Sequence, residues 1–179
     1  VTVVTLAIGV STMARRNAIV KRLASVETLG CTSVICSDKT GTLTLNEMTA
    51  VELFAGLRSR AVTGTGYEPA GFIETFDDDP STVLDGALVP MALCSDATVR
   101  ASGEGDDPWQ LVGDPTEGAL VVLAAKAGVD VDEVRRTHPR LAEVPFDSAN
   151  KFMLTVHETL SAEGQRSVVV YVKGAPDVL

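Results

Sequence analysis

A short polar segment, Asp38-Lys-Thr-Gly-Thr-Leu-Thr44, carries the residue types that phosphoryl chemistry requires. An aspartate carboxylate can attack a phosphate and form an acyl phosphate, which divides one difficult step into two easier ones. Lys39 supplies a cation, while Thr40 and Gly41 supply a hydroxyl, amides and a backbone that can approach a phosphate closely. These residue types are also common in ordinary turns. The complete seven-residue run favours a phosphoryl site over such a turn.

A second group of candidate residues surrounds two apolar segments, Phe152–Val156 and Ser167–Val172, which predict an antiparallel hairpin. Pairing would bring Lys151 and Lys173 to the same end of the sheet. Two ammonium groups with no carboxylate between them repel each other unless an anion is bound. Phe146 offers a flat surface on which an adenine can stack. As alternatives, such a phenylalanine is more often a core residue and single lysines are usually solvated.

The segment Gly113-Asp-Pro-Thr-Glu117 predicts the start of a helix. Asp114 suits the N-cap and Pro115 the first helical position, and Glu117 completes a capping-box arrangement. Gly128 is expected to end this helix. Glu117 is therefore either a helix-capping acid or a ligand contact, and the two roles do not exclude each other.

The elements that would position these residues can also be read from the pattern. Ser33-Val-Ile-Cys36 predicts a short buried parallel strand. Asp38 would then follow the strand's carboxyl end, where ligands bind in open α/β sheets. Further expected elements are a strand over Ala50–Phe54, a helix capped by Ser81 that reaches Cys94 and is bent or broken at Pro90, and a helix over Val131–Thr137.

Composition limits the possible functions. With 179 residues, 45% of them hydrophobic, the chain can form one or two compact domains. A net charge of -9 argues against a general nucleic-acid binder, which needs an excess of Lys and Arg. The three cysteines have no metal-ligand spacing and are expected to be reduced thiols.

The first ten residues are apolar, and four basic residues follow between positions 15 and 22. Ten residues cannot span a bilayer, which takes about 20 in a helix. A signal peptide would place its positive charges before the apolar run. The segment is either a buried part of a soluble protein or the last turns of a transmembrane helix that leaves on the cytoplasmic side. The second interpretation makes the chain a piece of a longer membrane protein.

The segment Cys36-Ser-Asp-Lys-Thr-Gly-Thr-Leu-Thr44 resembles the signature of P-type ATPases, which share a haloacid-dehalogenase-like phosphorylation domain. The resemblance implies that Asp38 is the phosphorylated nucleophile, with Lys39 and Thr40 beside it. It also implies that Asp38 and the carbonyl of Thr40 help to hold Mg²⁺. Three flanking segments resemble the type II branch of calcium-type cation pumps: Ala14–Val20, Ser25–Gly30 and Gly64–Pro69.

The resemblance extends to the nucleotide-domain motifs of type II pumps, at Gly113–Leu120, Pro145–Lys151 and Lys173–Asp177. It implies that Glu117 contacts the adenine amino group and that Phe146 stacks on the base. Lys151, Lys173 and Gly174 would line the pocket. Substitution of Phe146 or Lys173 is expected to weaken nucleotide binding and to leave the fold intact. Ser148 stands where many calcium pumps have an arginine, so that phosphate contact is not transferred.

The fold that the resemblance implies is α/β. Residues 1–30 would form the end of a transmembrane helix and a stalk. Residues 31–48 would begin the Rossmann-like phosphorylation domain, and residues 49–179 would form an α+β nucleotide-binding domain with an antiparallel sheet. ATP and Mg²⁺ are the expected ligands, and the transported cation would bind in membrane helices outside this cytoplasmic segment. Family members complete their Mg²⁺ site with a later aspartate-rich loop, so this piece is expected to bind Mg-ATP without turnover.

Two other functions stay open. One is a soluble aspartyl-phosphate phosphatase of the same superfamily, against which the N-terminal pattern and the long insertion after Thr44 count. The other is a nucleotide-binding regulatory module, which would not require the nucleophile Asp38. Calcium is the cargo by likeness, but sodium, proton, manganese or magnesium pumps share these cytoplasmic motifs.

Overall fold

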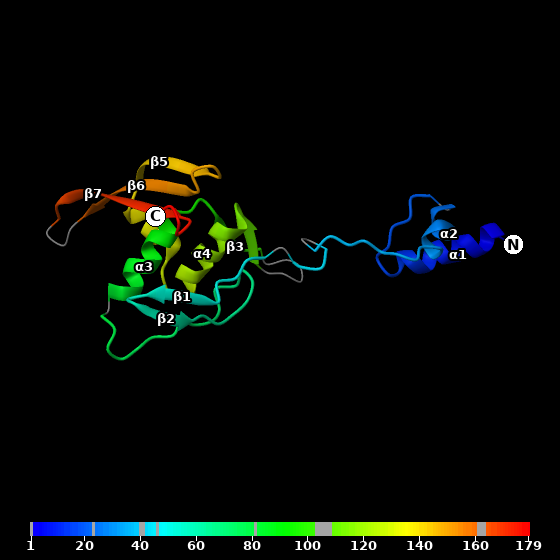
Figure 1. Ribbon diagram of the computed structural model, residues 1–179, viewed down its shortest axis with the longest axis horizontal. Coiled ribbons are helices and arrows are strands. Elements are labelled where there is room, and N and C mark those ends of the chain that lie inside the picture. The colour runs from blue at the N-terminus through cyan, green and yellow to red at the C-terminus, as the bar shows by residue number, and fades with distance from the viewer. Residues whose placement is uncertain are drawn as a thin grey trace. The chain divides into compact units, whose positions relative to one another are not determined.

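The computed structural model describes residues 2–22, 24–39, 42–45, 47–80, 82–102, 109–160 and 164–179. The chain forms two compact units, Val1–Leu45 and Asn46–Leu179. Figure 1 shows the helices and strands of each unit.

The N-terminal unit contains two helices, α1 (Thr2–Ala14) and α2 (Ala24–Gly30). Asn17 has a positive φ of 61° just after α1, a conformation that asparagine tolerates better than most residues. The 13 residues of α1 extend about 20 Å at 1.5 Å per residue. Within the described ranges, none of the helices combines the length and apolar character that crossing a membrane requires.

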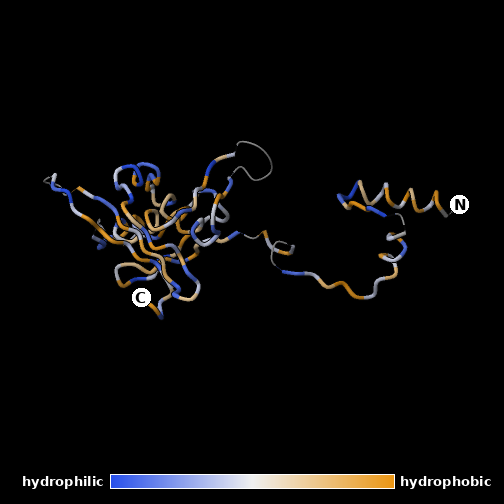
Figure 2. The backbone as a smooth tube through the Cα atoms, turned by 90° about the horizontal axis from the view of Figure 1, so that it is seen from above, coloured by the Kyte–Doolittle hydropathy of each residue, from blue (hydrophilic) through white to orange (hydrophobic). Residues whose placement is uncertain are grey.

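The strand predicted over Ser33–Cys36 is absent from the structure: this segment belongs to no strand. Val34 and Ile35 are 74% and 87% exposed. Figure 2 shows this hydrophobic run as an orange stretch of the tube. A parallel strand is stable when it hydrogen-bonds to neighbouring strands and when other elements cover both faces of the sheet. Among the described residues of Val1–Leu45, no segment provides that pairing, and the prediction of a strand over Ser33–Cys36 is wrong.

The second unit begins with a hairpin of β1 (Glu52–Ala55) and β2 (Arg58–Ala61). Ala55 pairs with Arg58, so Gly56 and Leu57 form a two-residue turn, and both have positive φ, 61° and 64°. These values define a type I′ turn, whose twist matches that of the strands. The predicted strand is confirmed within two residues, whereas its partner was not predicted.

The three-stranded antiparallel sheet has the order β5-β6-β7 and consists of β5 (Arg140–Asp147), β6 (Phe152–Leu160) and β7 (Arg166–Gly174). The predicted hairpin corresponds to β6 and β7. Strand β5 was not predicted, and it contains Pro145. A proline is tolerated here because β5 is an edge strand and its pairing is irregular between Val144 and Asp147. A separate antiparallel pair joins β3 (Thr98–Ala101) to β4 (Trp109–Val112).

Three helices pack in this unit: α3 (Thr82–Leu93), α4 (Pro115–Lys126) and α5 (Val131–Thr137). Helix α5 and the start of α4 lie where the sequence predicts them, and Gly128, with φ 84°, follows the end of α4. Helix α3 continues through Pro90 and is not broken there. The predicted cap of α3, Ser81, lies outside the described residues.

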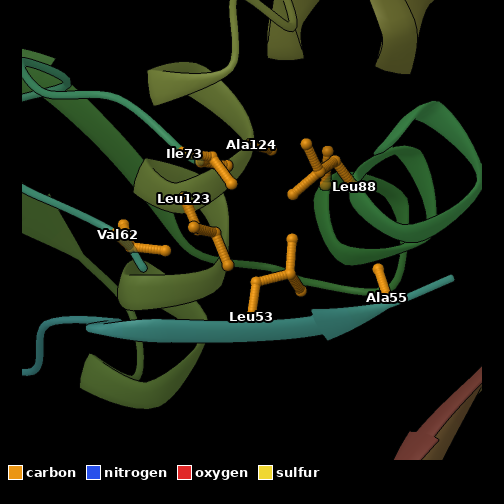
Figure 3. Packing of buried hydrophobic residues seen from close by; sticks show 8 residues of the cluster. Leu53, Ala55, Val62, Ile73, Leu88, Leu123 and Ala124 are labelled. Atoms are coloured by element: carbon orange, nitrogen blue, oxygen red, sulfur yellow. The ribbon is translucent and has the colours of Figure 1, made fainter. Parts of the chain in front are cut away.

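The core of this unit lies between the β1–β2 hairpin and the helices α3 and α4. Leu53 of β1, Leu88 of α3 and Leu123 of α4 point toward one another in Figure 3 and are at most 5% exposed. In Figure 1, α3 and α4 lie between that hairpin and the three-stranded sheet. The aliphatic core therefore fixes two helix ends, the C-terminus of α3 and the N-terminus of α4, close to the sheet.

Candidate functional site

A pocket of about 500 Å³ opens between the N-terminus of α4 and the ends of the three-stranded sheet. Its lining includes every residue that was assigned to nucleotide binding from the sequence: Glu117, Phe146, Lys151, Lys173 and Gly174. Asp114, Thr116, Leu120 and Ala175 complete the lining. Residues from three separate stretches of sequence thus meet at one site.

Helix α4 begins as the sequence predicts. The Asp114 carboxylate accepts hydrogen bonds from the amides of Thr116 at 2.8 Å and Glu117 at 3.2 Å, and Pro115 occupies the first turn. A side-chain oxygen at the N-cap satisfies amides that have no partner inside the helix. This cap places Glu117 in the first turn of α4, at the wall of the pocket.

The predicted capping box is half formed: the Glu117 amide donates to Asp114, but among the described contacts the Glu117 carboxylate does not reach back to the cap. One carboxylate oxygen, Oε2, instead accepts hydrogen bonds from the backbone amides of Asp96 at 2.7 Å and Ala97 at 3.0 Å. Both amides belong to the turn that follows α3. Packing of α3 against α4 brings these amides within hydrogen-bond distance of Glu117, so the carboxylate bonds across the interface.

The other oxygen of Glu117, Oε1, accepts a bond from the ammonium group of Lys173 at 2.6 Å. The two side chains are 12% and 22% exposed. The Lys173 nitrogen also lies 3.4 Å from the hydroxyl of Ser95. A carboxylate therefore pairs with Lys173, which the hairpin pattern did not predict. Because this pair is shielded from solvent, its Coulomb attraction is stronger than that of a pair in open water.

Lys151 lies at the rim of the pocket. Its ammonium group pairs with the Asp177 carboxylate at 2.9 Å, and the two side chains are 51% and 64% exposed. The backbone of Lys151 has φ 58° and closes a turn in which its amide donates to the carbonyl of Asp147 at 2.7 Å. An exposed pair of this kind contributes little and exchanges partners easily.

Gly174 pairs with Phe152 at the end of the sheet. A Cβ atom at this position would lie 2.6 Å from the carbonyl oxygen of Lys151 and 2.8 Å from the Cβ of Phe152. Only glycine permits this close approach. Met153 pairs with Lys173, which places Lys151 and Lys173 at the same end of the sheet, as the hairpin predicts.

Phe146 is 57% exposed and lines the pocket. Phe146 is therefore not a core residue, and its role as a stacking platform for a base stays a prediction. Together with Leu120 and Ala175 it forms an apolar surface beside the charged groups. Such a site suits a ligand that combines a flat ring with anionic groups.

The Asp38 segment belongs to the other unit. Asp38 and Lys39 are exposed, and the carbonyl of Lys39 accepts bonds from the amides of Leu43 at 3.0 Å and Thr44 at 3.2 Å. These two hydrogen bonds close a turn after Asp38. Thr40, predicted beside Asp38 and as a Mg²⁺ ligand, lies outside the described residues.

Sequence reasoning missed the amides of Asp96 and Ala97 and the carboxylate of Asp177 as parts of the site. A backbone amide has no signal in the sequence, because every residue except proline carries one. Asp177 lies inside the motif Lys173–Asp177. Its negative charge is the signal that could have identified it as a partner for a lysine.

Comparisons with known proteins show the family of this chain. The family model described as P-type ATPase, cytoplasmic domain N, matches residues 84–179, more than half of the chain. This chain therefore belongs to the P-type ATPases. The chain spans about a fifth of the length of the curated relatives that it matches.

Three relatives of this chain are named cation-transporting or calcium-transporting ATPases. The cation-transporting ATPase pma1 of Synechocystis sp. is 43% identical over 188 residues, which cover 100% of this chain and 20% of the relative. The calcium-transporting ATPase of Bacillus subtilis is 40% identical over 180 residues, with 98% and 19% covered. The calcium-transporting ATPase type 2C member 1 of Bos taurus is 43% identical over 187 residues, with 98% and 18% covered.

Proposed function

We propose that this chain is the ATP-binding and phosphorylated part of a cation pump, and that the pocket at the N-terminus of α4 holds the adenine nucleotide. The observation that carries the proposal is the meeting of Glu117, Phe146 and Lys173 in one pocket of about 500 Å³. Pockets of this size are typical of small-molecule sites.

Phe146 would stack on the adenine through its exposed ring. Glu117 would accept a hydrogen bond from the exocyclic amino group of adenine. Its two oxygens offer about four lone-pair positions, and three of them accept bonds from described residues. One position is then left for the base.

The two lysines would have different roles. The ion pair between Lys151 and Asp177 is exposed and weak. The ammonium group of Lys151 can therefore leave Asp177 and turn toward a phosphate. Lys173 is held by Glu117 in a shielded pair. We infer that Lys173 mainly fixes the carboxylate and that Lys151 is the more available cation.

Asp38 would be the nucleophile. Its carboxylate oxygen forms a bond to the γ-phosphorus of ATP as the bond to the β–γ bridging oxygen breaks, and ADP leaves with that electron pair. The exposed Asp38 carboxylate and the Thr40 carbonyl are hard oxygen donors of the kind that Mg²⁺ takes, so they fit the ion that the family uses. Mg²⁺ would neutralise phosphate charge during the transfer.

For the whole protein we infer an ATP-driven pump in a membrane, with this segment on the cytoplasmic side. Calcium is the proposed cargo, because two of the relatives described above are named calcium-transporting ATPases.

The nucleotide pocket is tested by titrating ATP into the 179-residue chain in a calorimeter. Phe146→Ala is expected to weaken ATP binding by about fivefold to a hundredfold, because stacking on an aromatic side chain contributes about 1–3 kcal/mol per base. Phe72→Ala is the matched control, since Phe72 is 61% exposed and does not line the pocket. Equal affinities for the wild type and Phe146→Ala would place the nucleotide elsewhere.

A further inference from the structure

We propose that Arg135 and Arg140 are positioning residues of the pocket, which hold the turn after α3 so that its amides orient the Glu117 carboxylate. The proposal rests on the nucleotide role of the pocket for its functional consequence. Neither arginine lines that pocket. Both act on the pocket through the backbone turn that follows α3.

Arg135, on α5, binds the end of α3. Its Nε donates to the carbonyl of Ala92 at 3.2 Å, and its Nη2 donates to the carbonyls of Ser95 at 2.9 Å and Ala97 at 3.0 Å. The last carbonyls of a helix have no partner inside the helix and carry its negative dipole end. A guanidinium group satisfies both needs with charge-assisted bonds.

Arg140, the first residue of β5, reaches the same turn. Its Nη2 donates to the carbonyls of Leu93 at 2.9 Å and Ser95 at 3.3 Å. Its Nη1 pairs with the carboxylates of Asp96 at 2.5 Å and Glu143 at 2.6 Å. Both arginines therefore converge on one atom, the carbonyl oxygen of Ser95.

The Ser95 carbonyl and the Asp96 amide belong to the same peptide group. A peptide group is planar and, when trans, its C=O and N–H point in opposite directions. Arginines that hold the carbonyl on one side therefore aim the amide at the other side. That amide donates to Glu117 Oε2 at 2.7 Å.

The turn is also confined from the side of α4. Ala97 is fully buried, and a Cβ atom at Gly113 would lie 2.9 Å from the Cα of Ala97. The turn thus lies between the arginines and the start of α4. A movement of the turn after loss of an arginine changes the hydrogen bonds that its amides donate to Glu117.

The convergence of two cations has an electrostatic cost. Burial, and then the positive charge of Arg140, lower the pKa of Arg135. A single guanidinium would satisfy the helix end at lower cost. The second one is explained by the need to hold the Ser95 peptide in a single orientation.

The experiment uses the 179-residue chain and ATP as the probe. Arg135→Met keeps the apolar stem and removes the guanidinium. We expect a loss of ATP affinity of about threefold to tenfold, which lies toward the lower end of the couplings between neighbouring residues. Arg136→Met is the matched control on the same helix, because Arg136 is exposed and pairs with Glu133. The control is expected to bind ATP as the wild type does.

A double-mutant cycle separates positioning from general destabilisation. In a Glu117→Ala background, Arg135→Met is expected to cause no further loss of ATP affinity, because the group that the arginine positions is gone. An equal loss in both backgrounds would overturn the proposal. If Arg135→Met unfolds, Arg140→Lys repeats the test, because it keeps the positive charge and removes the forked guanidinium group. The expected result and the result that would overturn the proposal are the same as for Arg135→Met.

Amide hydrogen exchange provides a measurement that needs no nucleotide. Exchange at Asp96 and Ala97 is expected to be several-fold faster in Arg135→Met and unchanged in Arg136→Met. If the wild-type chain fails to bind ATP, the proposed function fails, while faster exchange at these two amides still supports the positioning role. Unchanged exchange in a folded Arg135→Met variant would overturn it.

Discussion

At the scale of single residues, the pocket shows two ion pairs of different strength within one site. The Glu117–Lys173 pair is shielded, and three donors surround the carboxylate. The Lys151–Asp177 pair is exposed to solvent. A shielded carboxylate that loses its cation remains largely desolvated, whereas an exposed one is rehydrated.

Removal of the two ammonium groups should therefore have different effects on stability. Lys173→Met is expected to lower the free energy of unfolding by about 1–3 kcal/mol, because Glu117 loses a charged partner. Lys151→Met is expected to lower it by less than about 1 kcal/mol. Both should weaken ATP binding. Urea denaturation and calorimetry measure the two quantities, and similar stability losses in the two variants would contradict this distinction.

At the scale of secondary-structure elements, the β1–β2 turn contains a residue that does not suit its conformation. Leu57 has φ 64° and is 89% exposed. Left-handed backbone penalises most L-residues, and Asn or Gly is preferred at both central positions of a type I′ turn. The leucine thus lowers stability without compensating burial.

Leu57→Asn is expected to raise the free energy of unfolding by about 1 kcal/mol, the order of the penalty for a left-handed L-residue. Gly56→Ala should do the opposite, because Gly56 has φ 61° and its new Cβ would lie 2.9 Å from Val83 Cγ1. Thermal and urea unfolding measure both changes. A less stable Leu57→Asn variant would show that the leucine side chain contributes contacts of its own.

At the scale of the whole molecule, the proposed nucleophile Asp38 and the pocket lie in different compact units, Val1–Leu45 and Asn46–Leu179. Phosphoryl transfer needs the γ-phosphate in line with the attacking oxygen. In a pump, a change of state between such units would control that encounter, and phosphorylation would favour one global state through contacts that differ between the states.

In the full-length protein reconstituted in vesicles, Asp38→Asn is expected to abolish ATP-dependent calcium uptake. The amide cannot form the acyl phosphate. ATP binding should persist, since Asp38 does not line the pocket. Uptake that survives in Asp38→Asn would exclude the aspartyl-phosphate mechanism, while loss of ATP binding would show that the two units share the nucleotide.

Much of the site could be predicted from the sequence, because it depends on local signals. Asp114 and Pro115 mark the start of α4, and the alternating residues of β6 and β7 set the register that places Lys173. The type and spacing of Asp38 and its neighbours favour phosphoryl chemistry before any fold is known. Local signals of this kind persist through folding, because they act over a few residues.

Tertiary structure decided what each charged group contacts. Glu117 and Lys173 are 56 residues apart in the chain, and the amides of Asp96 and Ala97 have no sequence signal. Their meeting depends on the packing of α3 against α4 and the sheet. Pairing also decided against the Ser33–Cys36 strand, because hydrophobicity alone supplies no neighbour for a backbone. The sequence by itself determined which residues are candidates for the chemistry, and packing determined their partners.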